Sequence, residues 1–167
     1  MKKALLVVDM QNIYLGKDHA KFFTYNNNVL IENVNERISK YNKEDVIYII
    51  NIMKDNFINK FIPFKAYEGT KEVELVENLL LVNEVVISKY KGDAFSNPKL
   101  KQILDSREVQ ELEIIGIDGG GCVALTALGA SENGYDVSIY TNAVGTIFEK
   151  RAAKLNKKLR KKGVKFI

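Results

Sequence analysis

Residues 4–9 read Ala4-Leu5-Leu6-Val7-Val8-Asp9, a continuous apolar run that ends in a carboxylate. A strand that is covered by helices on both faces shows this all-apolar pattern, whereas a strand with one wet face alternates apolar and polar residues. The stretch therefore predicts a central strand of a parallel sheet. Five further segments have the same character and are expected to be strands: residues 46–53, 85–88, 112–117, 137–140 and 164–167.

Segments with helical periodicity separate these runs. The expected helices cover residues 29–41, 98–104, 123–133 and 147–162. Asn97 and Pro98 are typical of a helix start, and Gly134 and Gly163 are typical of helix ends. The regular alternation of strand and helix predicts an α/β protein. We expect a three-layer α/β/α fold with a six-stranded parallel sheet, Rossmann-like or flavodoxin-like, in a single domain of residues 1–167.

The composition is that of an ordinary globular domain, with 167 residues of which 46% are hydrophobic and 28% charged. These values exclude a collagen, a disordered tail and a disulfide-rich miniprotein. Cys122 is the only cysteine and His19 the only histidine, so we expect no internal disulfide, no Ser–His relay and no histidine-rich metal site. No apolar run is long enough to span a membrane, and the initial run is too short for a signal peptide. This favours a cytoplasmic protein without a membrane partner.

Positive charge is concentrated near the end of the sequence, where nine of the 25 Lys and Arg residues lie between positions 150 and 165 without any acid. A basic helix could bind nucleic acid or anionic lipid, because clustered cations attract polyanions. Ala152, Leu155 and Leu159, however, follow one another at helical spacing. We therefore favour a helix that packs these three residues on the core and leaves its lysines in solvent, with no nucleic-acid partner.

Three reactive side chains are expected at one edge of the sheet. Asp9 ends the first predicted strand, Lys89 follows the third, and Cys122 follows the fourth at the start of a helix. Ligands of open α/β sheets bind beyond the carboxyl ends of the strands. A lysine beside the thiol and the N-terminus of a helix would lower the pKa of Cys122 and favour the nucleophilic thiolate, while Asp9 carries protons.

Each of these residues also has an ordinary structural explanation, and only their coincidence at one edge favours catalysis. A lone cysteine is usually a small buried hydrophobe, a lysine after a strand usually lies on the surface, and an aspartate there often caps a turn. Two other classes of function stay open. Residues 119–124, Gly-Gly-Gly-Cys-Val-Ala, fit the G-x-G-x-x-A pattern of a nucleotide-binding loop. The chain could also be an inactive scaffold that keeps only the fold.

Three blocks of the sequence occur in a characteristic order. The first block is residues 5–12, Leu-Leu-Val-Val-Asp-Met-Gln-Asn. The second is Gly69-Thr70, followed by Lys89 at the end of a later strand and by Phe95 six residues after it. The third is residues 116–123, Gly-Ile-Asp-Gly-Gly-Gly-Cys-Val, followed by Thr126-Ala127 and Gly134-Tyr135. Together these blocks resemble the isochorismatase-like cysteine hydrolases, the family of nicotinamidases, N-carbamoylsarcosine amidohydrolase and ureidoacrylate amidohydrolase.

The resemblance implies a hydrolase that needs no cofactor and cleaves a carbon–nitrogen bond of a small amide, urea or carbamate through a thioester. Its catalytic triad would be Asp9, Lys89 and Cys122. It also implies an oxyanion hole formed by the backbone N–H groups of Asp118 and Cys122, with a cis peptide bond between Ile117 and Asp118.

The resemblance also bears on assembly, because members of the family generally form dimers or tetramers. We therefore expect a homodimer or homotetramer. Its contacts could include aromatic residues that a lone domain would have difficulty covering, namely Phe57, Phe61, Phe64 and Tyr67.

Two departures from the family pattern bear on the substrate. Gly119 stands where the family usually has threonine, and it belongs to a run of three glycines that predicts a supple loop. Residues 51–55, Asn-Ile-Met-Lys-Asp, stand where metal-binding nicotinamidases carry Asp-x-His, so that metal site is not expected. The residues expected to contact a small-molecule substrate are Tyr14, Phe95, Asp118 and Gly119, together with the aromatic segment 57–67.

The geometry of the triad also constrains the strand order. Neighbouring strands lie roughly 4.8 Å apart, so a lysine two strands from Asp9 would have to span roughly 10 Å. We therefore expect the first and third strands to be neighbours, in the flavodoxin-like order 2-1-3-4-5-6. The order 3-2-1-4-5-6 would need an additional strand before Lys89.

Overall fold

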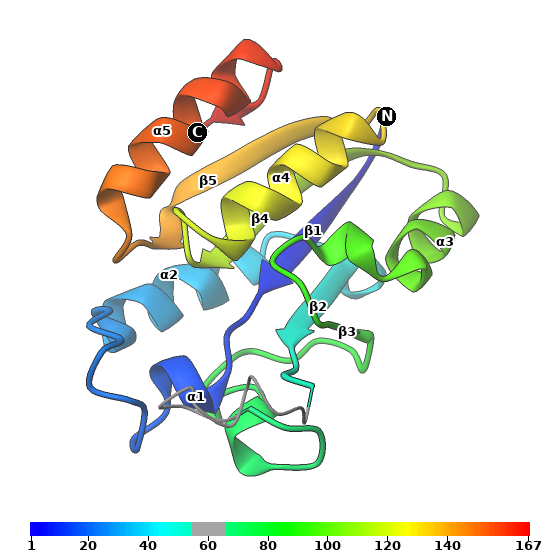
Figure 1. Cartoon of the computed structure of the whole chain (residues 1–167). Helices are drawn as coiled ribbons and strands as arrows, with labels where there is room; N and C mark the ends of the chain where they lie inside the picture. The colour runs from blue at the N-terminus through cyan, green and yellow to red at the C-terminus, as the bar shows by residue number, and fades with distance from the viewer. Residues whose placement is uncertain (55–65) are drawn as a thin grey trace.

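The structure, a computed structural model, describes residues 1–54 and 66–167 and contains a six-stranded sheet in which all neighbouring strands run parallel (Figure 1). The predicted α/β fold is confirmed. The strands are β1 (Lys2–Val8), β2 (Val46–Asn51), β3 (Val86–Lys89), β4 (Val109–Ile117), β5 (Asp136–Gly145) and β6 (Lys165–Phe166).

The helices divide between the two faces of the sheet. On one face, α2 (Asn27–Ile38) contributes its apolar side to a core that also includes Val76 and Leu79. On the other face, the core receives residues of α3 (Pro98–Ser106), α4 (Cys122–Glu132) and α5 (Glu149–Lys161). Shorter elements complete the described chain: α1 (Asn12–Leu15) and the 3-10 turns η1 (Lys43–Asp45), η3 (Lys71–Val73) and η4 (Ala94–Ser96).

The expected elements are all present, and their ends differ from the predicted ones by a few residues at most sites. The largest difference is in β5, which continues to Gly145 beyond the predicted end at residue 140. The polar residues Thr141 and Asn142 interrupt its apolar pattern because both are exposed, and strand pairing with β4 resumes at Val144.

The apolar run in β1 reflects burial on both faces. Leu5 and Val7 belong to the core beside α2, whereas Ala4, Leu6 and Val8 belong to the core on the opposite face. All five side chains are fully buried. Burial of a large aliphatic side chain stabilises a fold by about 1.5–3 kcal/mol, so β1 anchors both layers at once.

The predicted strand order is wrong. The sheet has the order β3-β2-β1-β4-β5-β6, so β2 lies between the strands that carry Lys89 and Asp9. In the register of β2 with β3, Asn51 is paired with Lys89, and the long lysine side chain extends across the end of β2 to the carboxylate of Asp9. The side chains of Lys89 and Asp9 thus span the width of β2, so their strands do not need to be neighbours. The described residues include no further strand between β2 and Lys89 other than β3 itself.

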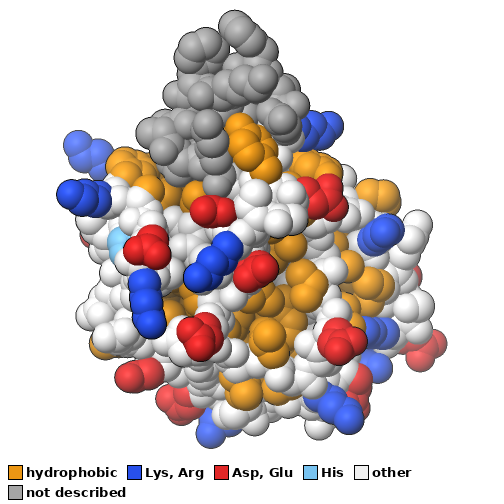
Figure 2. Space-filling model, turned by 90° about the horizontal axis from the view of Figure 1, so that it is seen from below, with side chains coloured by type: hydrophobic (Ala, Val, Ile, Leu, Met, Phe, Trp, Pro, Cys, Tyr) orange, Lys and Arg blue, Asp and Glu red, His pale blue; other side chains and the backbone are white. Residues whose placement is uncertain are grey.

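The basic segment near the end of the chain forms α5, whose Ala152 and Leu159 are buried while Leu155 packs against the same core. The predicted core-packed helix is therefore confirmed. In this helix, the guanidinium carbon of Arg160 lies 4.3 Å from the ring centroid of Phe166. None of the described helices combines the length and the apolar character that crossing a membrane requires. The face shown in Figure 2 mixes charged side chains of both signs with hydrophobic ones.

A buried carboxylate joins β4 to α2. The side chain of Glu113 is fully buried and accepts hydrogen bonds from the Arg37 guanidinium, including one of 2.7 Å from its terminal nitrogen, and one of 2.8 Å from Lys3. Arg37 also lies over the ring of Tyr140 at 4.2 Å. Burial by itself would raise the pKa of Glu113, but the hydrogen bonds from Arg37 and Lys3 outweigh it, so the pKa is lowered.

Replacing Arg37 by Met should therefore destabilise the fold at neutral pH, by about 2–4 kcal/mol, because it leaves a buried carboxylate with only Lys3. The lowered pKa means that the stabilisation is present above the ordinary value of 4.5 and is lost as the pH falls through the lower folded-state value. Urea unfolding at neutral and acidic pH measures both effects. Lys101→Met, which breaks the exposed pair with Asp105, is the control and should change little. An equal effect of the two variants would contradict the assignment.

Candidate active site

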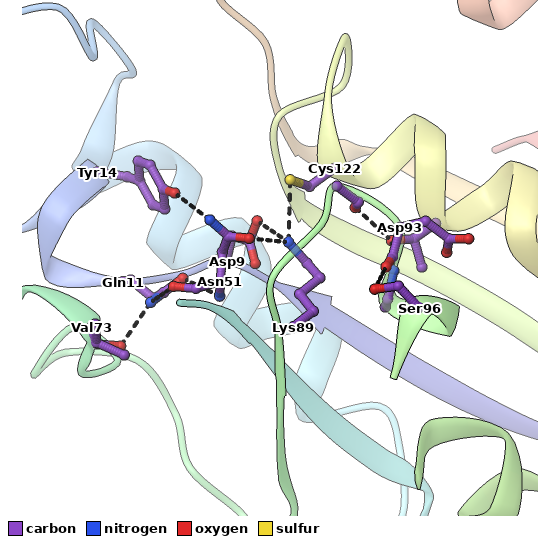
Figure 3. A network of polar contacts seen from close by, with 12 residues as sticks. Asp9, Gln11, Tyr14, Asn51, Val73, Lys89, Asp93, Ser96 and Cys122 are labelled. Carbon is purple, nitrogen blue, oxygen red and sulfur yellow. Dashed lines mark hydrogen bonds and ion pairs between the residues drawn. The ribbon is translucent and has the colours of Figure 1, made fainter. Parts of the chain in front are cut away.

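The structure brings Asp9, Lys89 and Cys122 together at the carboxyl edge of the sheet (Figure 3). The Nζ atom of Lys89 lies 2.9 Å from Oδ2 of Asp9 and 3.2 Å from Sγ of Cys122. Asp9 is 2% exposed and Lys89 is 1% exposed, while Cys122 is partly exposed. A carboxylate, an ammonium and a thiol from three different elements thus form one contact group.

Asp9 leaves the sheet in a left-handed backbone conformation, with φ of 56°. Aspartate is one of the few residues that adopt this conformation with modest strain. The Asp9 N–H still donates to the carbonyl of Ile49, at 2.9 Å, which fixes the turn against β2. One carboxylate oxygen of Asp9 accepts from Lys89, whereas the other, Oδ1, is buried and has no hydrogen-bond partner among the described residues. That oxygen is available to accept a proton.

The thiol is neutral at physiological pH. Burial, and after it the negative charge of Asp9, raise the pKa of Cys122 to about 12, and the opposing effect of Lys89 is smaller. The expectation that Lys89 and the helix N-terminus would lower the pKa of Cys122 below its ordinary value is therefore wrong in its net direction. Burial lowers the pKa of Lys89, but the negative charge of Asp9 and, once the thiol ionises, that of Cys122 outweigh it, so the pKa is raised. Lys89 remains a cation beside a protonated thiol.

Two amide side chains that the sequence analysis did not single out support this group. The Oδ1 atom of Asn51 accepts from Lys89 at 3.2 Å, and Gln11 hydrogen-bonds the backbone N–H and carbonyl of Asn51 at 2.8 and 3.0 Å. Gln11 also donates to the carbonyl of Val73. The available signal was position: Asn51 is a polar residue at the end of a buried strand, like Lys89, and Gln11 follows Asp9 by two residues.

The loop before Cys122 is held by the carboxylate of Asp118. This carboxylate accepts from the Tyr25 hydroxyl at 3.1 Å and from the backbone N–H groups of Gly120 and Ile147 at 2.6 and 2.7 Å. Both carboxylate oxygens of Asp118 thus accept hydrogen bonds from the protein itself, and a direct contact of Asp118 with substrate stays a prediction. The peptide bond between Ile117 and Asp118 is cis, in agreement with the implied geometry.

Two of the three glycines of this loop, Gly119 and Gly120, allow close packing, so the loop is not the flexible one that the sequence predicts. A Cβ atom on Gly119 would lie 2.3 Å from the hydroxyl oxygen of Thr146, and one on Gly120 would lie 2.5 Å from the Phe148 carbonyl. A small cavity of about 100 Å³ lies beside Gly119, on its β5 and α5 side. In the part of the chain that the structure describes, the N–H groups of Asp118 and Cys122 have no hydrogen-bond acceptor, so they could serve a ligand.

The other predicted substrate residues are not all near the thiol. The hydroxyl of Tyr14 lies 3.5 Å from Nδ2 of Asn51, and its ring meets Phe23 edge-on, with centroids 4.8 Å apart. Phe95, in contrast, packs against Tyr135, which follows α4 at the end opposite Cys122. The structure therefore does not bring Phe95 to this group. Phe57, Phe61 and Phe64 lie outside the described residues.

The residues present do not fit a metal centre. The donor at the end of β2 is the neutral amide of Asn51, and its oxygen is already engaged by the Lys89 ammonium. Residues 1–54 and 66–167 include no cluster of three or more His, Cys, Asp or Glu side chains that could hold a metal ion.

Replacing Gly120 by Ala should lower both the stability and the activity of the protein, because the new methyl group would displace the loop from the start of α5. Overpacking of this kind costs about 1–3 kcal/mol. Gly92→Ala is the matched control, since its methyl group would meet only the mobile end of Leu125. Thermal unfolding of both variants measures the difference. A Gly120→Ala protein as stable as Gly92→Ala would contradict the tight packing of the loop.

Comparisons with known proteins identify the family of this chain. The Isochorismatase domain family matches residues 3–167. An uncharacterized isochorismatase family protein of Bacillus subtilis, YrdC, is 28% identical over 144 residues, which is 85% of this chain and 73% of that protein. A secreted isochorismatase effector of Verticillium dahliae, Isc1, is 29% identical over 79 residues, 47% of this chain, and the match spans less than half of that protein, 42%.

A solved structure resembles nearly the whole molecule. The pyrazinamidase of Pyrococcus horikoshii, in a complex with zinc, superposes with a TM-score of 0.85 at 25% identity, over 100% of this chain and 99% of that one. The fold is thus shared with a protein named as a pyrazinamidase. The chain belongs to the isochorismatase-like hydrolase family.

Proposed function

We propose that the protein hydrolyses a carbon–nitrogen bond of a small amide, urea or carbamate, with Asp9, Lys89 and Cys122 as its catalytic residues. The observation that carries the proposal is the contact of one buried ammonium with both a carboxylate and a thiol. Asp9 has a free oxygen for a proton, and the backbone N–H of Cys122, at the start of α4, has no acceptor among the described residues. Relatives named as amidases support the same class of reaction.

Because the thiol is protonated, acylation begins with a proton transfer. Asp9 takes the proton from Cys122 through Oδ1, and the sulfur attacks the carbonyl carbon of the substrate. Negative charge develops on the carbonyl oxygen, where the N–H groups of Asp118 and Cys122 can donate hydrogen bonds. Asp9 then returns the proton to the leaving nitrogen, the carbon–nitrogen bond breaks, and the amine departs. A thioester on Cys122 remains.

Deacylation uses the same groups in the same order. Asp9 takes a proton from a water molecule, and the hydroxide oxygen attacks the thioester carbon. The new tetrahedral intermediate breaks its carbon–sulfur bond, which releases the acid, and Asp9 returns the proton to the sulfur. Throughout the cycle, Lys89 stays positively charged and balances the negative charge that moves between Asp9 and Cys122.

The structure disfavours a nucleotide-binding loop in this position. Backbone approach of phosphates needs an open glycine loop at a positive helix end. Here Gly119 and Gly120 pack against Thr146 and Phe148, and the carboxylate of Asp9 lies beside Cys122 at the start of the helix. An inactive scaffold is the remaining alternative, and a measurement of turnover distinguishes it from an enzyme.

The test of the proposal is ammonia release from a panel of small amides, ureas and carbamates. We expect turnover of at least one compound and a fall of more than about a thousandfold in Cys122→Ala, because the nucleophile is lost. Lys101→Met serves as the control, since Lys101 is an exposed residue of α3. Undiminished turnover in Cys122→Ala would remove the cysteine from the mechanism, and the absence of any turnover would favour the inactive scaffold.

A second prediction concerns the thiol itself and needs no substrate. Asp9→Asn keeps the shape of the side chain and removes the charge that, after burial, most raises the pKa of Cys122. The pKa should fall from about 12 toward its ordinary value of 9.0, so more thiolate is present at mildly alkaline pH. Alkylation by iodoacetamide should accelerate at least about tenfold, while turnover is lost.

The control for this experiment is Asp105→Asn, which removes a carboxylate from an exposed position on α3. It should leave the alkylation rate unchanged. An Asp9→Asn protein whose thiol reacts no faster than that of the parent would show that Asp9 does not hold the thiol in its neutral form.

A further inference from the structure

The end of β2 lies between the two charged members of the site. Because the strand order is β3-β2-β1, the side chain of Lys89 must extend over the last residue of β2 to reach Asp9. That residue is Asn51, which is paired with Lys89 in the parallel register. Figure 3 shows Asn51 beside Asp9, with the ammonium of Lys89 reaching both. The side chain at position 51 therefore borders the path of the lysine.

The hydrogen-bonding capacity of Lys89 is completely used. An ammonium has three N–H donors, and the three acceptors here are Asp9 Oδ2 at 2.9 Å, Asn51 Oδ1 at 3.2 Å and Cys122 Sγ at 3.2 Å. The side chain of Lys89 is fully buried, so these three acceptors of the protein surround the ammonium. Two of these acceptors belong to the base, Asp9, and the nucleophile, Cys122. The third belongs to Asn51, which thereby fixes the rotation of the ammonium, with one N–H directed to Asp9 and one to Cys122.

The amide of Asn51 is itself held in one orientation. Its oxygen must face Lys89, because an ammonium can only donate, and its NH₂ group then points to the hydroxyl of Tyr14 at 3.5 Å. Gln11 is fully buried; its side-chain oxygen accepts a hydrogen bond from the backbone N–H of Asn51, and its NH₂ group donates one to the backbone carbonyl of Asn51. These backbone bonds do not depend on the side chain at position 51, so a substitution there should leave the strand end in place.

We propose that Asn51 is a positioning residue, whose neutral amide oxygen holds the Lys89 ammonium so that its charge is shared between Asp9 and Cys122 alone. Its consequence for turnover rests on the proposed hydrolase function, whereas its effect on the thiol does not. A carboxylate at position 51 would compete for the same ammonium and add a negative charge to the site. A side chain without an acceptor would let the ammonium turn fully to Asp9. Both changes weaken the support that Lys89 gives to a negatively charged sulfur.

The other titratable groups around the sulfur do not obscure the effect that a charge at position 51 has on the pKa of Cys122. Asp9, Lys89, Tyr14 and Tyr25 interact electrostatically with Cys122, and Asp93 with Lys89. Burial raises the pKa of both tyrosines, which therefore stay neutral while the thiol titrates. Burial also raises the pKa of Asp93, which is the same in every variant compared and so affects all of them alike. Above neutral pH, the charges near the sulfur are thus those of Asp9, Lys89 and any charge placed at position 51.

The experiment measures the alkylation of Cys122 by iodoacetamide as a function of pH in Asn51→Asp, Asn51→Ala and the parent protein. Asp has the shape of Asn, so access to the thiol is unchanged while a charge is added. We expect the rate of Asn51→Asp at a given alkaline pH to fall at least about tenfold below the parent, because a nearby like charge raises the pKa of the thiol and each unit of pKa is a tenfold loss of thiolate below that pKa. Asn51→Ala should lie between the two. Asn142→Asp, which adds the same charge at an exposed position, is the control and should match the parent.

Thermal unfolding of each variant establishes that the fold is retained, and Asn51→Ala keeps the test decisive if Asn51→Asp does not fold. Parent-like pH profiles in the folded Asn51 variants would overturn the proposal, and so would faster alkylation of Asn51→Asp. With a substrate in hand, we also expect kcat to fall at least about tenfold in Asn51→Asp with KM nearly unchanged. If no substrate is found, the proposed hydrolase function fails, whereas the alkylation profiles still decide the role of Asn51.

Discussion

The ammonium group of Lys89 is buried at the carboxyl edge of the sheet, where water cannot replace the hydrogen bonds that it loses on folding. Burial of a charge is tolerated only where opposite charge and hydrogen-bond acceptors surround it. Here the three acceptors belong to residues that end β1 and β2 and begin α4. The requirement to satisfy one cation therefore ties together the ends of four elements. It also explains why a polar cluster can persist beside the apolar cores on both faces of the sheet.

The same interaction sets the protonation states of the site. Lys89 and Asp9 form an ion pair, so the nearby thiol experiences both charges, and its burial then decides the balance in favour of the neutral form. Such a site stores its nucleophile as a thiol and needs a base within reach. The unpartnered Oδ1 of Asp9 meets that need, which ties the resting electrostatics directly to the order of proton transfers in the proposed reaction.

A second carboxylate, that of Asp118, keeps the nucleophile loop rigid. It is bonded to one side chain and two backbone N–H groups, so the loop cannot move without breaking several hydrogen bonds. The adjacent glycines let the loop approach Thr146 and Phe148 closely. Pre-organised donors stabilise a developing oxyanion better than mobile ones, because they need no rearrangement during the reaction. This glycine-rich loop is tightly packed, because side-chain atoms beside Gly119 and backbone atoms beside Gly120 occupy the space that side chains would need.

Much of this protein is determined by local sequence. The apolar run of residues 4–8 requires cover on both faces, the helical spacing of Ala152, Leu155 and Leu159 requires a core-packed helix, and the polar ends of buried strands predict where Asp9 and Lys89 emerge. These features depend on the period of side chains along one segment. They can therefore be predicted from the sequence without knowing which other segments the segment contacts.

Tertiary structure alone decided the strand order, the net direction of the thiol pKa and the role of Asn51. Each depends on distances between segments far apart in the chain: the reach of Lys89 across β2, the balance of burial against two charges at Cys122, and the third hydrogen-bond acceptor of one ammonium. The sequence names the reactive groups, because strand ends are local features. It does not determine how their charges add, since electrostatic energies depend on separation and burial, and the folded chain alone sets both.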